Sequence, residues 1–147
     1  MDIDNEIKKI IDLNCFNLEM DRPNYRILST TNFATPTTLA AAASDGSEVI
    51  INKDFIVSNP QTYMLWLVLS HELRHIWQSK HADFFDSYDN SANMSLKDYN
   101  AQKAEIDAWA WAIIMVQGFL GVRPTLEVQL GEEFLKKVYK RIDELLK

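Results

Sequence analysis

Two histidines with a glutamate between them, in the segment HELRH at positions 71–75, form a HExxH motif whose side chains could bind and use a metal ion. Residues four positions apart on an α-helix point in nearly the same direction, so the imidazoles of His71 and His75 can reach one ion. Zinc suits this pair, because imidazole is a good zinc ligand and a third protein ligand would still leave one position for water. Glu72 would lie beside that ion, where its carboxylate can accept a proton from the water. The spacing therefore predicts a Zn²⁺ site with Glu72 as the catalytic base.

The same segment also fits a buried structural helix whose two histidines are satisfied by hydrogen bonds. The charge of Glu72 distinguishes the two hypotheses. A buried carboxylate with no cation beside it is costly, and the residues from Tyr63 to Leu69 just before the motif are almost all apolar. We therefore expect a positive charge close to Glu72, which favours the metal site.

Two residues compete to be the third metal ligand. His81 follows His75 by six residues, which completes the HExxHxxxxxH spacing of the metzincin zinc peptidases. That family has Gly at the position of Gln78, where the chain must leave the helix sharply, whereas Gln favours a continued helix. Glu105 lies thirty positions after His75, on a separate predicted helix that can pack beside the first, as in the gluzincin peptidases. We expect Glu105 to be the third ligand, and His81 remains the alternative.

The segment that starts at Glu105, EIDAWAWA, resembles the ExxA[ND]xFA motif of the ImmA/IrrE-like metallopeptidases, small proteins often carried by phages and mobile elements. The first motif of that family is HELGH. Glu105, Ala108 and Ala112 match the second motif, and Trp111 stands where an aromatic residue is expected. The resemblance covers about residues 48–117 and includes the order of the parts, which is hairpin, HExxH helix, loop and glutamate-bearing helix.

The chain departs from that family at two positions. Arg74 replaces the Gly of the first motif, and Trp109 replaces the Asn or Asp that the family has in the second. A tryptophan cannot orient a ligand as a carboxamide would, so Asp107 or Asp98 is the candidate for that role. Residues two apart on a helix point to nearly opposite sides, so Glu105 and Asp107 should not both bind the metal.

The resemblance implies a zinc-dependent peptidase that cuts a regulatory protein, such as the repressor of a phage or mobile element. The donor that would stabilise the oxyanion is not fixed, because Tyr88, Tyr99 and Arg74 are all candidates. The alternative from a different functional class is a zinc-bound, non-catalytic protein-interaction module of phage type. Glu72 argues against that alternative, since structural zinc does not need it.

Apolar residues recur at helical spacing in four segments that have helix start or stop signals. The HExxH helix is apolar nearly all round before its motif, so it should be central and buried. The helix with Glu105 should end at Gly118, because glycine is a natural C-terminal stop. The stretch from Ala82 to Lys97 mixes acidic and aromatic residues and should be a loop. The expected helix starts are Asp2 or Asp4, Asn59-Pro60, Ser95 and Gly131.

Strand signals are confined to the segment before the HExxH helix. Tyr25 to Ser29 should be extended, and Leu39 to Ala43 should form a hairpin with Glu48 to Asn52 through Asp45-Gly46. The second arm is rich in β-branched residues and should be the best strand. Together these elements predict an α+β fold. In it, the HExxH helix and the Glu105 helix pack against a small antiparallel sheet, and the N- and C-terminal helices complete the packing.

Composition narrows the choice of partners and compartment. The 147 residues, 47% hydrophobic, should form one domain over 1–147. The net charge of −6 argues against nucleic acid or an anionic membrane surface, so a protein or peptide substrate is expected. Cys15 is the single cysteine, and the acidic start of the chain does not resemble a signal peptide. The longest apolar run, Met64 to Leu69, is too short for a membrane span. We therefore expect a cytoplasmic location.

Overall fold

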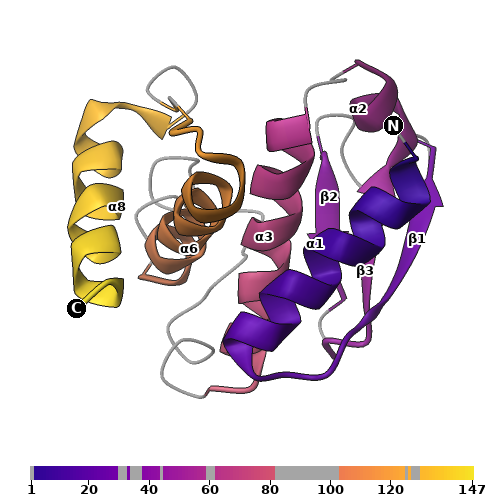
Figure 1. Cartoon of the computed structure of the whole chain (residues 1–147), viewed down its shortest axis with the longest axis horizontal. Helices are drawn as coiled ribbons and strands as arrows, with labels where there is room; N and C mark the ends of the chain where they lie inside the picture. The colour runs from indigo at the N-terminus through magenta and orange to yellow at the C-terminus, as the bar shows by residue number, and fades with distance from the viewer. Residues whose placement is uncertain are drawn as a thin grey trace.

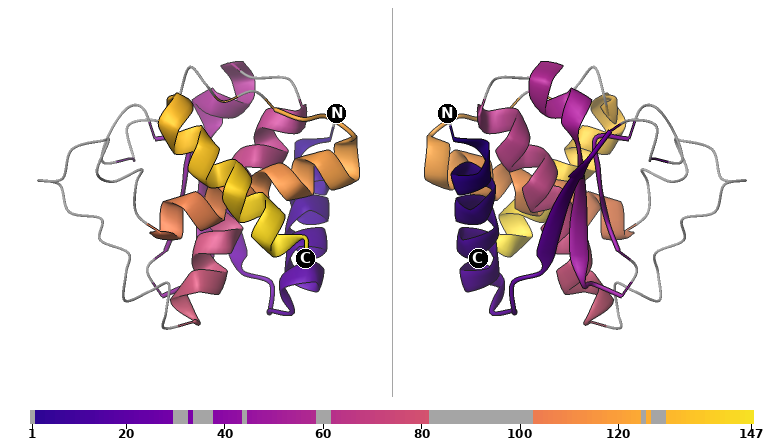
Figure 2. Two further views of the ribbon diagram at one scale, coloured as in Figure 1. Left: turned by 90° about the vertical axis from the view of Figure 1, so that its left-hand side faces the viewer. Right: turned by 90° about the vertical axis from the view of Figure 1, so that its right-hand side faces the viewer.

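The helix that carries the HExxH motif, α3 (Thr62–Ser79), lies between two later helices and a small sheet (Figure 1). On one side α6 (Lys103–Leu120) packs across α3, and α8 (Glu132–Leu145) packs on α6. The helix α1 (Ile3–Leu18) and the sheet lie on the other side, and Figure 2 shows these layers from two further directions. The computed structural model describes residues 2–29, 33, 38–43, 45–58, 62–81, 103–124, 126 and 130–147.

The sheet has three strands in the order β1-β3-β2. The hairpin predicted from Asp45-Gly46 is present, because β2 (Ala40–Ala42) pairs antiparallel with β3 (Glu48–Asn52). The remaining strand, β1 (Asn24–Leu28), pairs in parallel with β3, so the sheet is mixed rather than wholly antiparallel. The hairpin is a local feature of the sequence, whereas the direction of the β1 pairing depends on the path of the chain between distant segments.

The hairpin turn rests directly on α3. Gly46 has a φ of 75°, in the left-handed region that glycine adopts without strain. A Cβ at this position would lie 3.3 Å from Cγ2 of Ile76, one residue after the HExxH motif. A small residue is therefore needed both for the turn and for its close packing against the helix.

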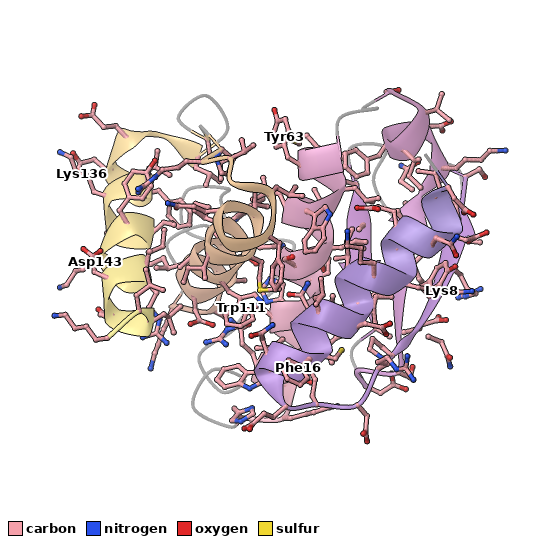
Figure 3. All side chains as sticks on the ribbon, viewed as in Figure 1. Lys8, Phe16, Tyr63, Trp111, Lys136 and Asp143 are labelled. Atoms are coloured by element: carbon pink, nitrogen blue, oxygen red, sulfur yellow. The ribbon has the colours of Figure 1, made fainter. Side chains whose placement is uncertain are left out.

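The apolar core surrounds α3 and continues on both sides of it. Ile7, Ile10 and Ile11 of α1 are buried, and Asp2 caps this helix by accepting a hydrogen bond from the N–H of Asn5. The charged face of α8 points away from α6, as Figure 3 shows for its labelled residues. Among the helices that the structure describes, none combines the length and the apolar character needed to cross a bilayer.

The predicted α+β class is confirmed, and the differences are local. The helix with Glu105 runs past Gly118 to Leu120, because the stop is Gly121, which has a φ of 68° and donates its N–H to the carbonyl of Gln117. The helix starts predicted at Asn59-Pro60 and at Ser95, and the loop predicted at 82–97, lie outside the described residues.

Candidate metal centre

Two helices bring the three predicted ligands together. His71 and His75 come from successive turns of α3, and Glu105 comes from the first turn of α6. The Nε2 atom of His71 lies 3.1 Å from Oε2 of Glu105, and Nε2 of His75 lies 2.7 Å from Oε1 of the same carboxylate. We call His71, His75 and Glu105 the ligand triad.

The donor set and the spacing of the ligand triad fit a metal ion. One nitrogen or oxygen from each of the three residues lies within 4.8 Å of the other two. Ligand atoms of a tetrahedral zinc site are about 3.3 Å apart when each bond is about 2 Å long. The distances from the two imidazole nitrogens to the Glu105 carboxylate, 3.1 and 2.7 Å, are close to that value, so the three residues could be arranged around one ion.

Glu72 lies between the ligand triad and the edge of the sheet. Its Oε2 accepts a hydrogen bond of 3.1 Å from the N–H of Ala42 on β2, and its Oε1 lies 3.2 Å from Nδ1 of His71. The carboxylate is therefore held next to one predicted ligand, on the side of the site that faces the sheet. Its contact with His71 is at Nδ1, whereas Nε2 of the same ring faces Glu105.

Charges within the site oppose the effect of burial. Burial alone would lower the pKa of His71, but the carboxylates of Glu105 and Glu72 outweigh it and hold that pKa well above its ordinary value. Burial alone would raise the pKa of Glu105, but His71 and His75 hold it well below its usual range. The site therefore favours a positive charge beside the Glu105 carboxylate, which a divalent metal ion would supply.

His81 lies outside this group. Because α3 continues to Ser79, the chain does not turn back at Gln78, and His81 comes after the helix has ended. Its ring is exposed and stacks on Trp77, with 3.8 Å between the ring centroids, and its Nδ1 lies 2.7 Å from the Trp77 carbonyl. The structure therefore groups Glu105, and not His81, with His71 and His75.

No family model, curated protein or solved structure matches this chain. The resemblance to the ImmA/IrrE-like metallopeptidases therefore depends on the two motifs and on the way their side chains meet. At the two departures from those motifs, the structure shows what the replacing residues, Arg74 and Trp109, do instead.

Arg74 forms a buried ion pair with Asp107 of α6. Its Nε and Nη2 donate to the two carboxylate oxygens at 2.6 and 2.9 Å, and its guanidinium lies 3.8 Å from the ring centroid of Trp77. Both charged residues are almost fully buried. Arg74 is thus unsuited to the oxyanion role considered from the sequence, because its guanidinium already binds a carboxylate; Tyr88 and Tyr99 lie outside the described residues.

Trp109 packs against a predicted ligand instead of hydrogen-bonding to one. Its ring lies 4.2 Å from that of His71, with 31° between the planes. Glu105 is one turn earlier on the same face of α6, so the helix presents a carboxylate and then an aromatic ring to the α3 histidines. Trp109 therefore restricts the rotation of the His71 imidazole by contact.

The residue that sequence reasoning missed is Gln78. Its Oε1 lies 2.7 Å from Nδ1 of His75, and its Nε2 donates to Asp107. Asp107, suggested from the sequence as an orienting residue, thus contacts the ligand triad only indirectly, through Gln78. The spacing of Gln78 to His75 was a usable signal, because residues three apart on a helix are neighbours. In the sequence, however, Gln78 stands out only as a departure from the metzincin pattern.

Proposed function

We propose that this chain is a zinc-dependent peptidase that hydrolyses peptide bonds in a protein substrate. One observation carries the proposal: two imidazoles from α3 and a carboxylate from α6 meet within 4.8 Å, and Glu72 lies beside them. Three protein ligands of this kind leave a position open, as catalytic zinc sites require. The resemblance of the two motifs to those of the ImmA/IrrE-like metallopeptidases supports the same activity.

Each residue of the site then has a defined part in hydrolysis. The ligand triad holds the zinc ion, which, when bound, polarises the peptide carbonyl and makes a water molecule more acidic. Glu72 accepts a proton from the attacking water and transfers it to the nitrogen of the leaving amine. The peptide C–N bond breaks, and the water oxygen remains on the new carboxylate.

The edge of the sheet supports a peptide as the substrate. In the part of the sheet that the structure describes, β2 is an edge strand, and the N–H of Ala42 points to Glu72 instead of to β3. This outer N–H of β2 therefore faces the proposed catalytic base. An extended peptide that paired with this edge would lie along the site, in the way that exposed sheet edges bind peptides in other proteins.

The resemblance and the charge of the chain indicate the kind of substrate. The family implication is a regulatory protein, such as the repressor of a phage or mobile element, cut in the cytoplasm. The net charge of −6 supports a protein substrate over nucleic acid, because phosphate binding needs clustered Lys and Arg.

The test compares zinc-loaded wild type with Glu72→Gln on a mixed peptide library. The variant should lose roughly 10²- to 10⁴-fold in cleavage rate, because general acid–base catalysis contributes an effect of that size. Its zinc content should stay at the wild-type level, since the carboxylate of Glu72 is not a ligand. Glu133→Gln, an exposed change on α8, is the matched control and should cleave like wild type.

A second candidate function is a zinc-bound, non-catalytic protein-interaction module. The observation that favours it is that both carboxylate oxygens of Glu72 already have neighbours in the fold, Ala42 and His71. On that hypothesis Glu72 helps to join α3 to the sheet. Equal, metal-independent behaviour of wild type and Glu72→Gln in the cleavage assay would support the module and contradict the peptidase.

A further inference from the structure

The side-chain amide of Gln78 can have only one orientation. One of its terminal atoms lies 2.8 Å from the backbone carbonyl of Ala104, which can accept a hydrogen bond but cannot donate one. The same atom lies 2.9 Å from Oδ2 of Asp107, whose carboxylate stays ionised beside its cationic partners. The atom that faces these two acceptors must be Nε2. Oε1 must therefore face His75.

This orientation fixes the proton on the imidazole of His75. Oε1 of Gln78 is an acceptor 2.7 Å from Nδ1 of His75, so Nδ1 must carry the hydrogen. In the neutral ring, Nε2 then has the lone pair, and Nε2 is the atom that lies 2.7 Å from Glu105. The imidazole is thus held in the tautomer, and in the direction, that a metal ion in the ligand triad would need.

Asp107 holds Gln78 in place and is itself fully engaged. Arg74 donates to both of its oxygens, and Arg141 of α8 donates to Oδ1 at 2.9 Å. Because Gln78 donates to Oδ2, each oxygen of this buried carboxylate accepts two hydrogen bonds. These bonds hold the Asp107 carboxylate away from the metal site. A chain of hydrogen bonds therefore runs from Arg141 on the outer helix through Asp107 and Gln78 to His75.

We propose that Gln78 is a positioning residue that sets the tautomer and direction of His75 for metal binding, with Asp107 and Arg141 as its supports. The inference rests on the proposed metal site. It goes beyond that site by naming the residue, three positions after the motif, that prepares one ligand for the ion. Partners of this kind that orient metal-binding histidines typically change metal affinity by about 10- to 100-fold when they are removed.

The experiment measures the zinc dissociation constant by competition with a chromophoric chelator. Gln78→Leu should bind zinc roughly 10- to 100-fold more weakly than wild type. Asn14→Leu is the matched control, because Asn14 is also a buried amide that bonds to α3, at Ser70, whereas its other described partners are the Ile10 carbonyl and Trp111, outside the ligand triad. Its zinc affinity should equal that of wild type. Arg141→Met, which removes the outer support, should weaken zinc binding in the same direction by less.

A second readout needs no substitution. ¹⁵N NMR of the histidine rings in the zinc-loaded wild type should show His75 with its proton on Nδ1 and its metal bond on Nε2. Zinc bound through Nδ1 of His75, or Gln78→Leu with the affinity of wild type, would overturn this inference and leave the metal site standing. Failure of wild type to bind zinc would overturn the proposed function and this inference with it.

Discussion

The two histidines of the ligand triad are held by different kinds of contact. His75 is fixed by a hydrogen bond to Gln78, whereas His71 is fixed by the ring of Trp109 and by the carboxylate of Glu72. Both imidazoles thus have an oxygen at Nδ1, but only His71 also packs against an aromatic ring, which restricts its rotation. The two ligands should therefore respond differently when their neighbours are changed.

The identity of the third ligand can be tested by metal content. Glu105→Ala removes a carboxylate that lies within 3.1 Å of both imidazoles, so the purified variant should lose its zinc. His81→Ala should keep its zinc, because that ring stacks on Trp77 at the exposed end of α3. Zinc measured by atomic absorption in both variants gives the answer, and full retention of zinc by Glu105→Ala would contradict the assignment.

At this scale the sequence predicted the grouping of His71, His75 and Glu105 better than it predicted the contacts that support them. The spacing of His71 and His75 defines a common direction on any helix, and Glu105 could be found because it starts a second recognisable motif. The role of Gln78 depends on Asp107 and on the Ala104 carbonyl, which reach it only when α6 crosses α3. Such contacts exist only because the two helices cross, and no local sequence pattern specifies that crossing.

At the scale of elements, the Asp107 carboxylate joins three helices. Its partners come from α3 and α8, and it lies on α6, so one buried charge links the motif helix to the outer helix. Burial alone would raise its pKa, but the hydrogen bonds and charge of Arg74, with Gln78 and Arg141, hold its pKa below the ordinary value. The ionised form is thus favoured in the folded state.

Acid should therefore weaken the packing of these helices. The stabilisation from a lowered pKa is complete above the ordinary value of 3.8 and is lost as the pH falls through the lower folded value. Asp107→Asn should lower the free energy of unfolding at neutral pH by about 3 kcal/mol, because it leaves the buried guanidinium of Arg74 without its carboxylate partner. It should also lose less stability than wild type below pH 3.8.

Urea unfolding at a series of pH values measures both effects. Asp143→Asn is the control for a change of charge alone, because this residue lies on the exposed face of α8. Its unfolding should follow the wild-type pH profile. If Asp107→Asn and wild type lost stability in parallel below pH 3.8, the Asp107 pairing would not be the cause.

The elements themselves were predictable to different degrees. The helices and the hairpin follow from periodicity and from Asp45-Gly46, which are local signals. The parallel pairing of β1 with β3 is a contact between distant segments, and the extended pattern of Tyr25 to Ser29 was equally compatible with either direction. The helix α6 continues past the predicted stop at Gly118 and stops at Gly121. A single glycine inside a helix lowers its stability by only about 1 kcal/mol, which packing easily outweighs.

At the scale of the whole molecule, metal binding should add to the stability of the fold. The ligand triad joins α3 to α6, and an ion that binds only the folded chain stabilises it by mass action. At free zinc about a thousandfold above its dissociation constant, the gain is about 4 kcal/mol. Chelation should therefore lower the melting temperature, as measured by circular dichroism.

The control for this prediction is the ligand-deficient chain. Glu105→Ala should show a much smaller change in melting temperature when chelator is added, because it lacks the ligand that comes from α6. His81→Ala should respond like wild type. An unchanged melting temperature in chelated wild type would contradict the role of the ion in joining the two helices.

The pairing of Asp107 with Arg141 also bears on how the molecule is made. A ribosome releases residue 107 well before residue 141, so a growing chain has the carboxylate before it has the second guanidinium. Until α8 has emerged, burial of that carboxylate is only partly compensated and the support of His75 is incomplete. The ligand triad of the proposed enzyme would thus gain its full support only after α8 has left the ribosome.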